Sequence, residues 1–187
     1  MQDVAINIPI GNKVAISLFT EHHLRVYSPL NRGFHRRERN AETLANELLY
    51  SKLLIQSLRL LGDLGGYHVG MVYRGVRRFG SEYISTLYDD LIAGRSSLRV
   101  GIPIKFLAFT STSRDIAADE RFGTDFFYSI DLIDNQGVSI AGLSAFGPSE
   151  NEVLLIPPAV FTVTSVELVN HSIRVSLTGV ASAFRYL

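Results

Sequence analysis

The spacing of apolar residues changes once along this chain, at a glycine-rich segment that begins at Gly62. Before it, apolar residues recur at helical intervals, both in residues 13–19 and in six leucines between 44 and 58 that we place on one helix face. After it, short runs rich in β-branched and aromatic residues are separated by turn residues. Helices followed by a series of short strands favour an α+β domain over an alternating βαβ fold.

We expect a single domain over residues 1–187, with a helical part at about 12–62 and a sheet core at about 67–180. The expected strands lie at 67–75, 104–113, 125–132, 137–143, 152–156, 160–169 and 172–177, and a short helix lies at 81–92. A chain of 187 residues has the size of one domain and can bury a core without disulfides or metals.

The composition excludes several classes of protein. The absence of cysteine removes disulfides, cysteine zinc ligands and thiol nucleophiles, and it fits a protein that works in a reducing cytosol. The five histidines lack metal-ligand spacing, so we expect no metal site. Because 18 basic residues balance 18 acidic ones, the net charge gives no general case for nucleic-acid binding.

Membrane insertion and classical secretion are also not expected. No apolar run approaches the roughly 18–20 residues of a membrane span. Asp3 and Pro9 make the N-terminal segment a poor secretory signal. Export would therefore need an instruction outside this chain or a route that leaves no such signal.

Three short segments combine residues that could carry chemistry. The segment 72–75 places Arg74 at the end of an apolar strand, and the segment 109–113 ends a second strand in a row of hydroxyl groups. In the segment 148–158, Glu150 and Glu152 would share one side of a strand that began that early, as a general-base pair would. Taken singly, each segment also fits a structural role: an edge-strand arginine, a β-turn, and a charged turn before a buried strand. No dinucleotide-binding or P-loop glycine motif is present.

Together and in this order, the three segments resemble the R-S-E signature of ADP-ribosyltransferases, and the arginine-specific, cholera-toxin-like clade is the most similar. The intervals are 37 residues from Arg74 to Ser111 and 41 residues from Ser111 to Glu152. The resemblance covers roughly residues 14–165. It includes Phe19-Thr20 in the first-helix region, and Ser144 ahead of the turn that leads to the EVLLIPP run.

The resemblance implies an ADP-ribosyltransferase fold, in which two antiparallel sheets form an NAD cleft and N-terminal helices pack on one side. It implies that Arg74 binds the phosphate and ribose of NAD and that Gly75 leaves its backbone open to the nicotinamide amide. Ser111 would hydrogen-bond the catalytic carboxylate and the nicotinamide ribose. Glu152 would bind the ribose 2′-hydroxyl and stabilise the oxocarbenium-like state. Glu150 would orient or deprotonate the acceptor guanidinium.

Two loops receive roles by their position. The loop 146–151 would present the acceptor, and the loop 114–123 would cover the bound NAD, with Arg121 contacting phosphate and Phe122 stacking on nicotinamide. Within the superfamily, Arg74 disfavours the His-Tyr-Glu clade, and Glu150 disfavours the Gln-x-Glu enzymes. The absence of cysteine disfavours the extracellular, disulfide-bonded vertebrate branch.

The function implied is that of a bacterial toxin or effector that transfers ADP-ribose from NAD to an arginine of a target protein and releases nicotinamide. Alternatives are an NAD glycohydrolase that depletes NAD and a non-catalytic binding module. The implied partners are NAD, a target protein with an accessible arginine and, if the victims are bacteria, an immunity protein that blocks the cleft. The protein would be secreted or injected and would act in the cytosol of the target cell.

Overall fold

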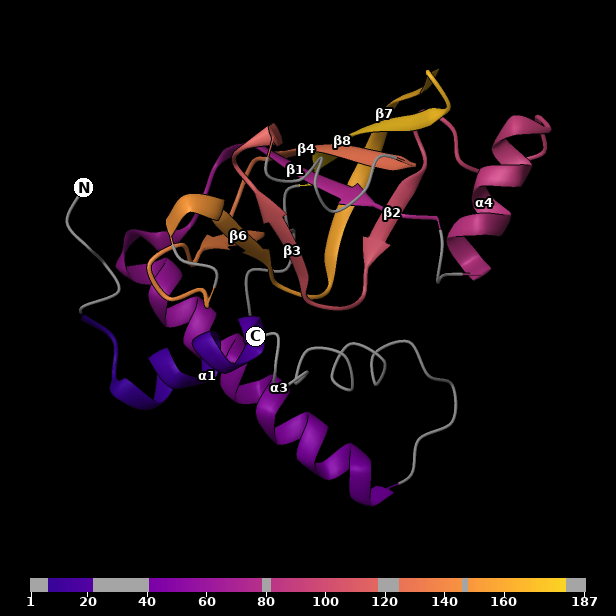
Figure 1. Cartoon of the computed structure of the whole chain (residues 1–187). Helices are drawn as coiled ribbons and strands as arrows, with labels where there is room; N and C mark the ends of the chain where they lie inside the picture. Colours follow the sequence, from indigo (N-terminus) through magenta and orange to yellow (C-terminus); the bar gives the residue numbers. More distant parts are fainter. Residues whose placement is uncertain (1–6, 22–40, 79–81, 118–124, 146–147, 181–187) are drawn as a thin grey trace. The chain divides into compact units, whose positions relative to one another are not determined.

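The computed structural model describes residues 7–21, 41–78, 82–117, 125–145 and 148–180 (Figure 1). Within these ranges the side chains of residues 41–47, 82–84 and 150 are not described. The chain forms two compact units. Unit 1 comprises Met1–His68, Phe106–Ser111 and Asn135–Ala159, and unit 2 comprises Val69–Lys105, Thr112–Asp134 and Val160–Leu187.

Two helices lie side by side in unit 1, α1 (Ile10–Thr20) and α3 (Ala41–Leu61) (Figure 1). Pro9, which precedes the first helical residue, accepts backbone bonds from Asn12 and Lys13 through its carbonyl oxygen. Two hydrogen bonds join the helices: Asn12 Nδ2 donates to Ser57 Oγ at 2.8 Å, and the Tyr50 hydroxyl donates to the Ala15 oxygen at 2.6 Å. Burial raises the pKa of Tyr50 to about 12.

The core of unit 1 gathers apolar side chains from both helices and from three later segments of the chain. Its buried members are Ile8, Ile16, Phe19, Leu54, Leu58, Leu61, Phe109, Val138, Ile140 and Leu154. Fully burying a side chain of this kind contributes about 1.5–3 kcal/mol. The helix faces are therefore held mainly by apolar contact, and the two polar bonds between them add specificity.

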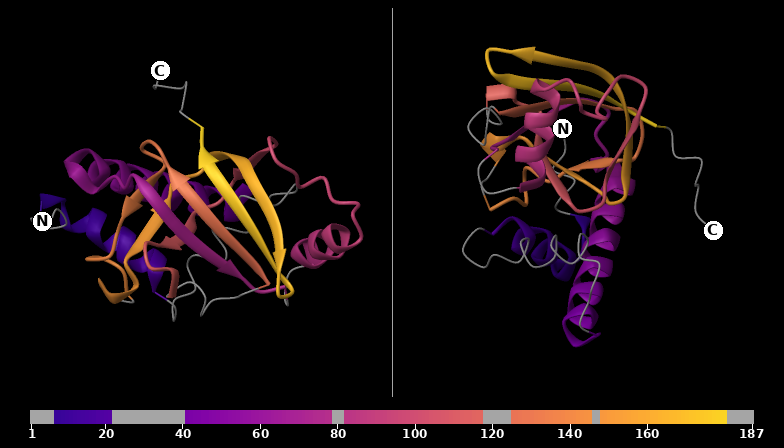
Figure 2. Two further views of the ribbon diagram at one scale, coloured as in Figure 1. Left: turned by 90° about the horizontal axis from the view of Figure 1, so that it is seen from above. Right: turned by 90° about the vertical axis from the view of Figure 1, so that its right-hand side faces the viewer.

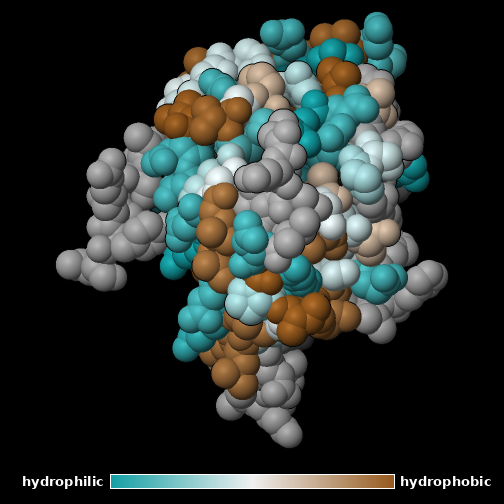
Figure 3. All heavy atoms as spheres, turned by 90° about the vertical axis from the view of Figure 1, so that its left-hand side faces the viewer, coloured by the Kyte–Doolittle hydropathy of each residue, from teal (hydrophilic) through white to brown (hydrophobic). Residues whose placement is uncertain are grey.

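The leucines of α3 do not form one buried face, as the sequence pattern suggested. Leu54 and Leu58 are fully buried, whereas Leu49 is 67% exposed and Leu53 is 41% exposed. Figure 3 shows apolar side chains at the surface in the lower part of the molecule, where the helices of unit 1 lie. The reason for the difference is that leucines at alternating intervals of four residues and one residue spread around more than one side of a helix with 3.6 residues per turn.

Helix α3 ends in the glycine-rich segment, as predicted. A π-helical turn, η2 (Gly62–Gly66), follows directly. Within it Gly65 has a φ of +102°, which residues other than glycine rarely adopt. A Cβ atom on Gly62 would lie only 2.3 Å from the ring of Tyr67, so that ring needs a glycine beneath it. These two positions explain why the helix stops here and why the chain can turn into the first strand.

The strands of unit 2 lie side by side in Figure 2, left. The strands are β1 (Gly70–Val76), β2 (Pro103–Phe106), β3 (Thr110–Ser113), β4 (Phe126–Leu132), β7 (Ala159–Val169) and β8 (Ser172–Gly179). Some residues of β2, β3 and β7 belong to unit 1. Strand β4 pairs with β1 in antiparallel register, Gly70 opposite Leu132 through Val76 opposite Phe126. Strand β4 pairs with β8 in parallel register.

The β7–β8 hairpin closes with Asn170 and His171, which have φ values of +49° and +65°. Two adjacent positive φ values fit the two-residue turn that matches the twist of a hairpin. The helix α4 (Glu82–Ile92) contacts this turn, because the Tyr88 hydroxyl donates to the His171 oxygen at 2.9 Å. The guanidinium of Arg78 lies 4.9 Å from the centre of the Tyr88 ring and 3.6 Å from the Asp89 carboxylate.

Unit 1 contributes the short strands β5 (Gly137–Ser139) and β6 (Glu152–Leu155), which pair antiparallel, and the 3₁₀ turn η3 (Pro148–Glu150) between them. Hydrogen-bonded neighbours give the order β2-β7-β8-β4-β1-β3-β6-β5. The α+β class is confirmed. The prediction of two antiparallel sheets differs from the structure, in which the strands follow one hydrogen-bonded order and β4 pairs with β8 in parallel register.

The predicted strand at 104–113 is divided in two, and the predicted strand at 137–143 ends early. The run 104–113 is divided at residues 107–109 because its first part, β2, neighbours β7, while its second part, β3, neighbours β1 and β6. The run 137–143 ends at Ser139 because the amides of Leu143 and Ser144 both turn back to the Ile140 oxygen, each at 2.8 Å. None of the helices in the described ranges is long and apolar enough to cross a membrane.

Candidate active site

Glu152 is the first residue of strand β6, and it follows a tight turn. The amide of Asn151 bonds to the Pro148 oxygen at 3.2 Å, and Asn151 itself has a φ of +48°. Asparagine tolerates this left-handed conformation better than most residues. The strand therefore begins at Glu152, and Glu150 lies in η3. The strand does not begin early enough for side-chain alternation to relate Glu150 to Glu152, because alternation applies only to extended residues. The side chain of Glu150 lies outside the described part.

The carboxylate of Glu152 is held in the interior of unit 1. Its residue is only 5% exposed, and Ser144 Oγ donates to its Oε2 at 2.5 Å. A hydroxyl-to-oxygen distance this short is typical of a bond to a charged carboxylate. The backbone is held as well, because the Ile140 amide donates to the Glu152 oxygen at 3.0 Å. A buried carboxylate with a fixed orientation can act on a developing positive charge without first reorganising.

Ser111 lies in the part of strand β3 that belongs to unit 1, and it is half-buried. Strands β3 and β6 are hydrogen-bonded neighbours, so Ser111 and Glu152 lie on adjacent strands. The hydroxyl of Thr110, the residue before it, donates to the Ala108 oxygen at 3.1 Å. The structure thus places Ser111 and Glu152 in one unit and on neighbouring strands.

Arg74 and Gly75 lie in unit 2, near the end of strand β1. In the β1–β4 register Arg74 is opposite Tyr128 and Gly75 is opposite Phe127. Arg74 is half-buried and Gly75 is buried. The first motif is therefore positioned by a long ladder of backbone hydrogen bonds. Arg121, Phe122 and Phe146, which the resemblance also implicates, lie outside the described residues.

No contact role was predicted for Ser144 or for Thr20. Ser144 follows a strand that pairs antiparallel with β6, and Ile140 is opposite Glu152 in backbone hydrogen bonding. Any hydroxyl a few residues after Ile140 is therefore a candidate partner for the Glu152 side chain. That signal was present in the spacing of the two strands. The contact of Thr20 with Ala145 joins residues 125 positions apart, and no local pattern indicates it.

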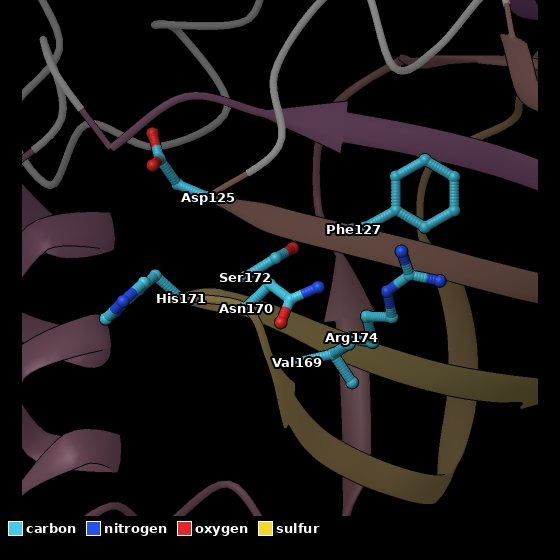
Figure 4. Close-up of a pocket in the computed structure, with 7 residues that line it drawn as sticks. All are labelled: Asp125, Phe127, Val169, Asn170, His171, Ser172 and Arg174. Carbon is cyan, nitrogen blue, oxygen red and sulfur yellow. The ribbon is translucent and has the colours of Figure 1, made fainter.

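A hollow of about 330 Å³ lies at the β7–β8 turn of unit 2, away from the predicted motifs in sequence. It is lined by Asp125, Phe127, Val169, Asn170, His171, Ser172 and Arg174 (Figure 4). The Arg174 side chain extends toward the Phe127 ring, with 5.9 Å between the guanidinium carbon and the ring centre. No predicted site residue lines this hollow. Among the described residues, no three or more His, Cys, Asp or Glu are grouped so that they could hold a metal ion.

Comparison with solved structures supports the fold. The chain is similar to the ADP-ribosyltransferase Vis of Vibrio splendidus, with 23% identity and a TM-score of 0.72. The match covers 95% of this chain and 78% of Vis, and that structure of Vis is a complex with agmatine. It is also similar to the ADP-ribosyltransferase HopU1 of Pseudomonas syringae, with 23% identity, a TM-score of 0.68, and coverage of 90% and 76% of the two chains.

Sequence comparison adds vertebrate relatives. The chain is 30% identical over 159 residues to the human ecto-ADP-ribosyltransferase 5, a match that covers 82% of this chain and 49% of that protein. The chain thus spans about half the length of the curated relatives it matches. These relatives belong to the vertebrate branch that the absence of cysteine disfavoured, whereas Vis and HopU1 are bacterial.

The family model described as NAD:arginine ADP-ribosyltransferase matches residues 10–183, which is nearly the whole chain. This range includes all three motifs, the strand β6 that begins with Glu152, and Ser144, which donates to the Glu152 carboxylate. The chain therefore belongs to the NAD:arginine ADP-ribosyltransferase family.

Proposed function

We propose that this protein transfers ADP-ribose from NAD to an arginine side chain of a target protein and releases nicotinamide. The observation that carries the proposal is the buried Glu152 carboxylate, oriented by Ser144 at 2.5 Å in a chain that belongs to this family. A carboxylate so placed suits the stabilisation of a cationic ribose.

In the proposed reaction, the bond between ribose C1′ and the nicotinamide nitrogen breaks, and its electron pair leaves with nicotinamide. Glu152 stabilises the resulting oxocarbenium-like charge and binds the ribose 2′-hydroxyl. An arginine nitrogen then forms a bond to C1′ and loses one proton, which Glu150 accepts. Arg74 binds phosphate and ribose, since its planar fork of donors suits phosphate oxygens, while Gly75 offers its backbone to the nicotinamide amide and Ser111 contacts the ribose.

Two findings support arginine as the acceptor. The family description specifies arginine, and the similar enzyme Vis has been crystallised with agmatine. Agmatine carries the same guanidinium group as an arginine side chain. A guanidinium is fully protonated at neutral pH and is a poor nucleophile in that state, so an acidic residue such as Glu150 is needed to align and deprotonate it.

We further propose that the protein is a toxin or effector that acts in the cytosol of a target cell. The bacterial proteins of similar fold include one described as a toxin, Vis. If the victims are rival bacteria, the producing cell needs an immunity protein that covers the site. A growth assay tests this role: expression in a sensitive cytosol arrests growth, and Glu152→Gln relieves the arrest at equal protein levels.

The acceptor is tested by incubating the protein with labelled NAD and agmatine and measuring both ADP-ribosyl-agmatine and free ADP-ribose. We expect Glu150→Gln to lose transfer by about 10²–10⁴-fold and to keep appreciable NAD hydrolysis, because water needs less help than guanidinium. Asp63→Asn, which removes an exposed carboxylate elsewhere in unit 1, serves as the matched control. Hydrolysis without any transfer by the parent would favour the NAD glycohydrolase, and no NAD consumption at all would overturn the proposal.

A further inference from the structure

The last residue of helix α1 is joined to the Glu152 carboxylate by a short series of hydrogen bonds within unit 1. Thr20 Oγ1 accepts the Ala145 amide at 2.8 Å, and the neighbouring Ser144 donates from Oγ to Glu152 Oε2 at 2.5 Å. Thr20 and Glu152 are each 5% exposed, so water offers little substitute for these bonds. The first helix thereby contacts the turn that orients the predicted catalytic carboxylate.

Thr20 has both of its hydrogen-bonding functions in use. Its hydroxyl donates to the Ser17 oxygen at 2.9 Å, one turn earlier in α1, which leaves the lone pairs of its oxygen directed to the Ala145 amide. A methyl group in place of this hydroxyl would leave the Ala145 amide without that acceptor. Because an unsatisfied amide is costly, the segment at residues 144–145 would shift to find another acceptor.

The turn that carries Ser144 forms a closed set of contacts with Glu152. The Ile140 amide bonds to the Glu152 oxygen at 3.0 Å, the Ser144 amide bonds to the Ile140 oxygen at 2.8 Å, and the Ser144 hydroxyl returns to the Glu152 side chain. Backbone and side chain of Glu152 are therefore held by the two ends of one five-residue turn, residues 140–144. Thr20 ties the far end of that turn to helix α1 through the Ala145 amide.

We propose that Thr20 and Ser144 are positioning residues for Glu152, with Thr20 acting through the Ala145 amide and Ser144 acting directly on the carboxylate. This inference rests on the proposed function, in which Glu152 stabilises the charge on ribose. Such a role depends on placement, since a misplacement of about 1 Å in an active site can cost roughly 10²-fold in rate. Thr20 makes α1 part of the catalytic apparatus without touching NAD.

The test measures kcat and KM for NAD by nicotinamide release in Thr20→Val, Thr20→Ser and the parent. Thr20→Val keeps the shape and loses the hydroxyl, and we expect kcat to fall about tenfold with KM for NAD changed less than about twofold. Thr20→Ser keeps the hydroxyl and restores kcat to within about threefold of the parent. Ser57→Ala is the matched control, because it removes an α1–α3 hydrogen bond of similar length without reaching the turn; it lowers the melting temperature and leaves kcat unchanged.

A double variant separates positioning from general destabilisation. Ser144→Ala alters a half-buried turn residue and keeps the test available if Thr20→Val folds poorly. Because the two residues act in series, the double variant Thr20→Val with Ser144→Ala is expected to be no slower than Ser144→Ala alone. Additive losses, equal losses in Ser57→Ala and Thr20→Val, or no rescue by Thr20→Ser would overturn the inference.

The outcome also shows which claim has failed. If the parent releases nicotinamide, Glu152→Gln does not, and both Thr20→Val and Ser144→Ala match the parent, the positioning inference is wrong and the proposed function stands. If the parent and Glu152→Gln release nicotinamide equally, or neither does, the proposed function is wrong and the inference falls with it.

Discussion

Arg74 and Glu152 are both predicted to act on NAD, but different kinds of contact hold them. Arg74 lies within a seven-residue strand, β1, and each of these residues has a partner in β4. Glu152 lies at the very start of a four-residue strand, directly after a turn with a left-handed residue, Asn151. The backbone ladder places Arg74, whereas a side-chain hydrogen bond from Ser144 places the Glu152 carboxylate.

This difference indicates what kind of change each of the two residues tolerates. A ladder of many backbone bonds is not altered by replacing one side chain, so a change at Arg74 should affect binding and little else. A carboxylate oriented by a side-chain hydrogen bond from a turn residue depends on its local contacts, so small changes around Glu152 should affect the rate.

Glu152→Gln should abolish both NAD hydrolysis and transfer, by at least about 10²–10³-fold in kcat. The amide is nearly the same shape as the carboxylate and lacks only the charge that stabilises the cationic ribose. Nicotinamide release measures the loss, and an unchanged melting temperature shows that the fold is kept. The control is Glu167→Gln, a carboxylate opposite Arg174 on the β7–β8 hairpin. Activity within twofold of the parent in Glu152→Gln would contradict the assigned role.

Arg74→Lys should raise KM for NAD by about tenfold, with a smaller change in kcat, because lysine keeps the charge and loses the planar fork of donors. The ladder of β1 should keep the melting temperature unchanged. Arg77→Lys, just beyond the end of β1, makes the same substitution at an exposed position and should leave KM unchanged. Normal NAD kinetics in Arg74→Lys would remove Arg74 from the NAD site.

Ser111→Ala should lower kcat by a few-fold to about tenfold, the size expected for one lost hydrogen bond of about 1–1.5 kcal/mol. The comparison with Arg74→Lys is informative, because we expect the defect here in kcat and there in KM. Ser165→Ala is the control, since it removes a hydroxyl that lies 2.9 Å from Ser176 Oγ on the β7–β8 hairpin. A fully active Ser111→Ala variant would show that the second motif is structural.

Much of the fold could be predicted from apolar spacing because burial and spacing are directly linked. The end of α3 at Leu61 and the strands β4 and β7 follow the predicted ranges within one or two residues. The interruption at residues 107–109 could not be predicted in this way. The pattern of apolar residues indicates which side chains are buried, but it does not indicate that β2 and β3 pair with different neighbours.

The candidate site shows the same limit. The order of Arg, Ser and Glu motifs indicated the family, and these motifs lie on β1, β3 and β6. The start of β6 at Glu152 depends on the left-handed conformation of Asn151, which alternation cannot anticipate. The bond from Thr20 to the Ala145 amide depends on how a helix packs against a turn 125 residues later. Contacts of that kind follow from tertiary packing and leave no local pattern.

The smallest expected effect concerns Tyr50, which holds α3 to α1 and has no predicted part in the chemistry. Its hydroxyl donates to the Ala15 oxygen at 2.6 Å, and burial raises its pKa to about 12. Tyr50→Phe should lower the free energy of unfolding at pH 7 by about 1 kcal/mol, or roughly 2–4 °C in melting temperature. We expect kcat and KM to stay unchanged. Tyr88→Phe in unit 2 is the control, since its hydroxyl also donates to a backbone oxygen, that of His171 at 2.9 Å.

The pH dependence distinguishes burial of Tyr50 from the loss of a simple hydrogen bond. An unfolded tyrosine titrates near pH 10, and the folded one titrates at about 12, so between these values the unfolded chain has released a proton that the folded chain keeps. The contribution of Tyr50 to stability is therefore complete below about pH 10 and declines as the pH rises toward 12. Denaturant unfolding of the parent should show this decline, Tyr50→Phe should lack it, and Tyr88→Phe should retain it. Equal slopes in the parent and Tyr50→Phe between pH 10 and 12 would mean that the Tyr50 hydroxyl is accessible to water, and that the contact between α1 and α3 is looser than the 2.6 Å bond indicates.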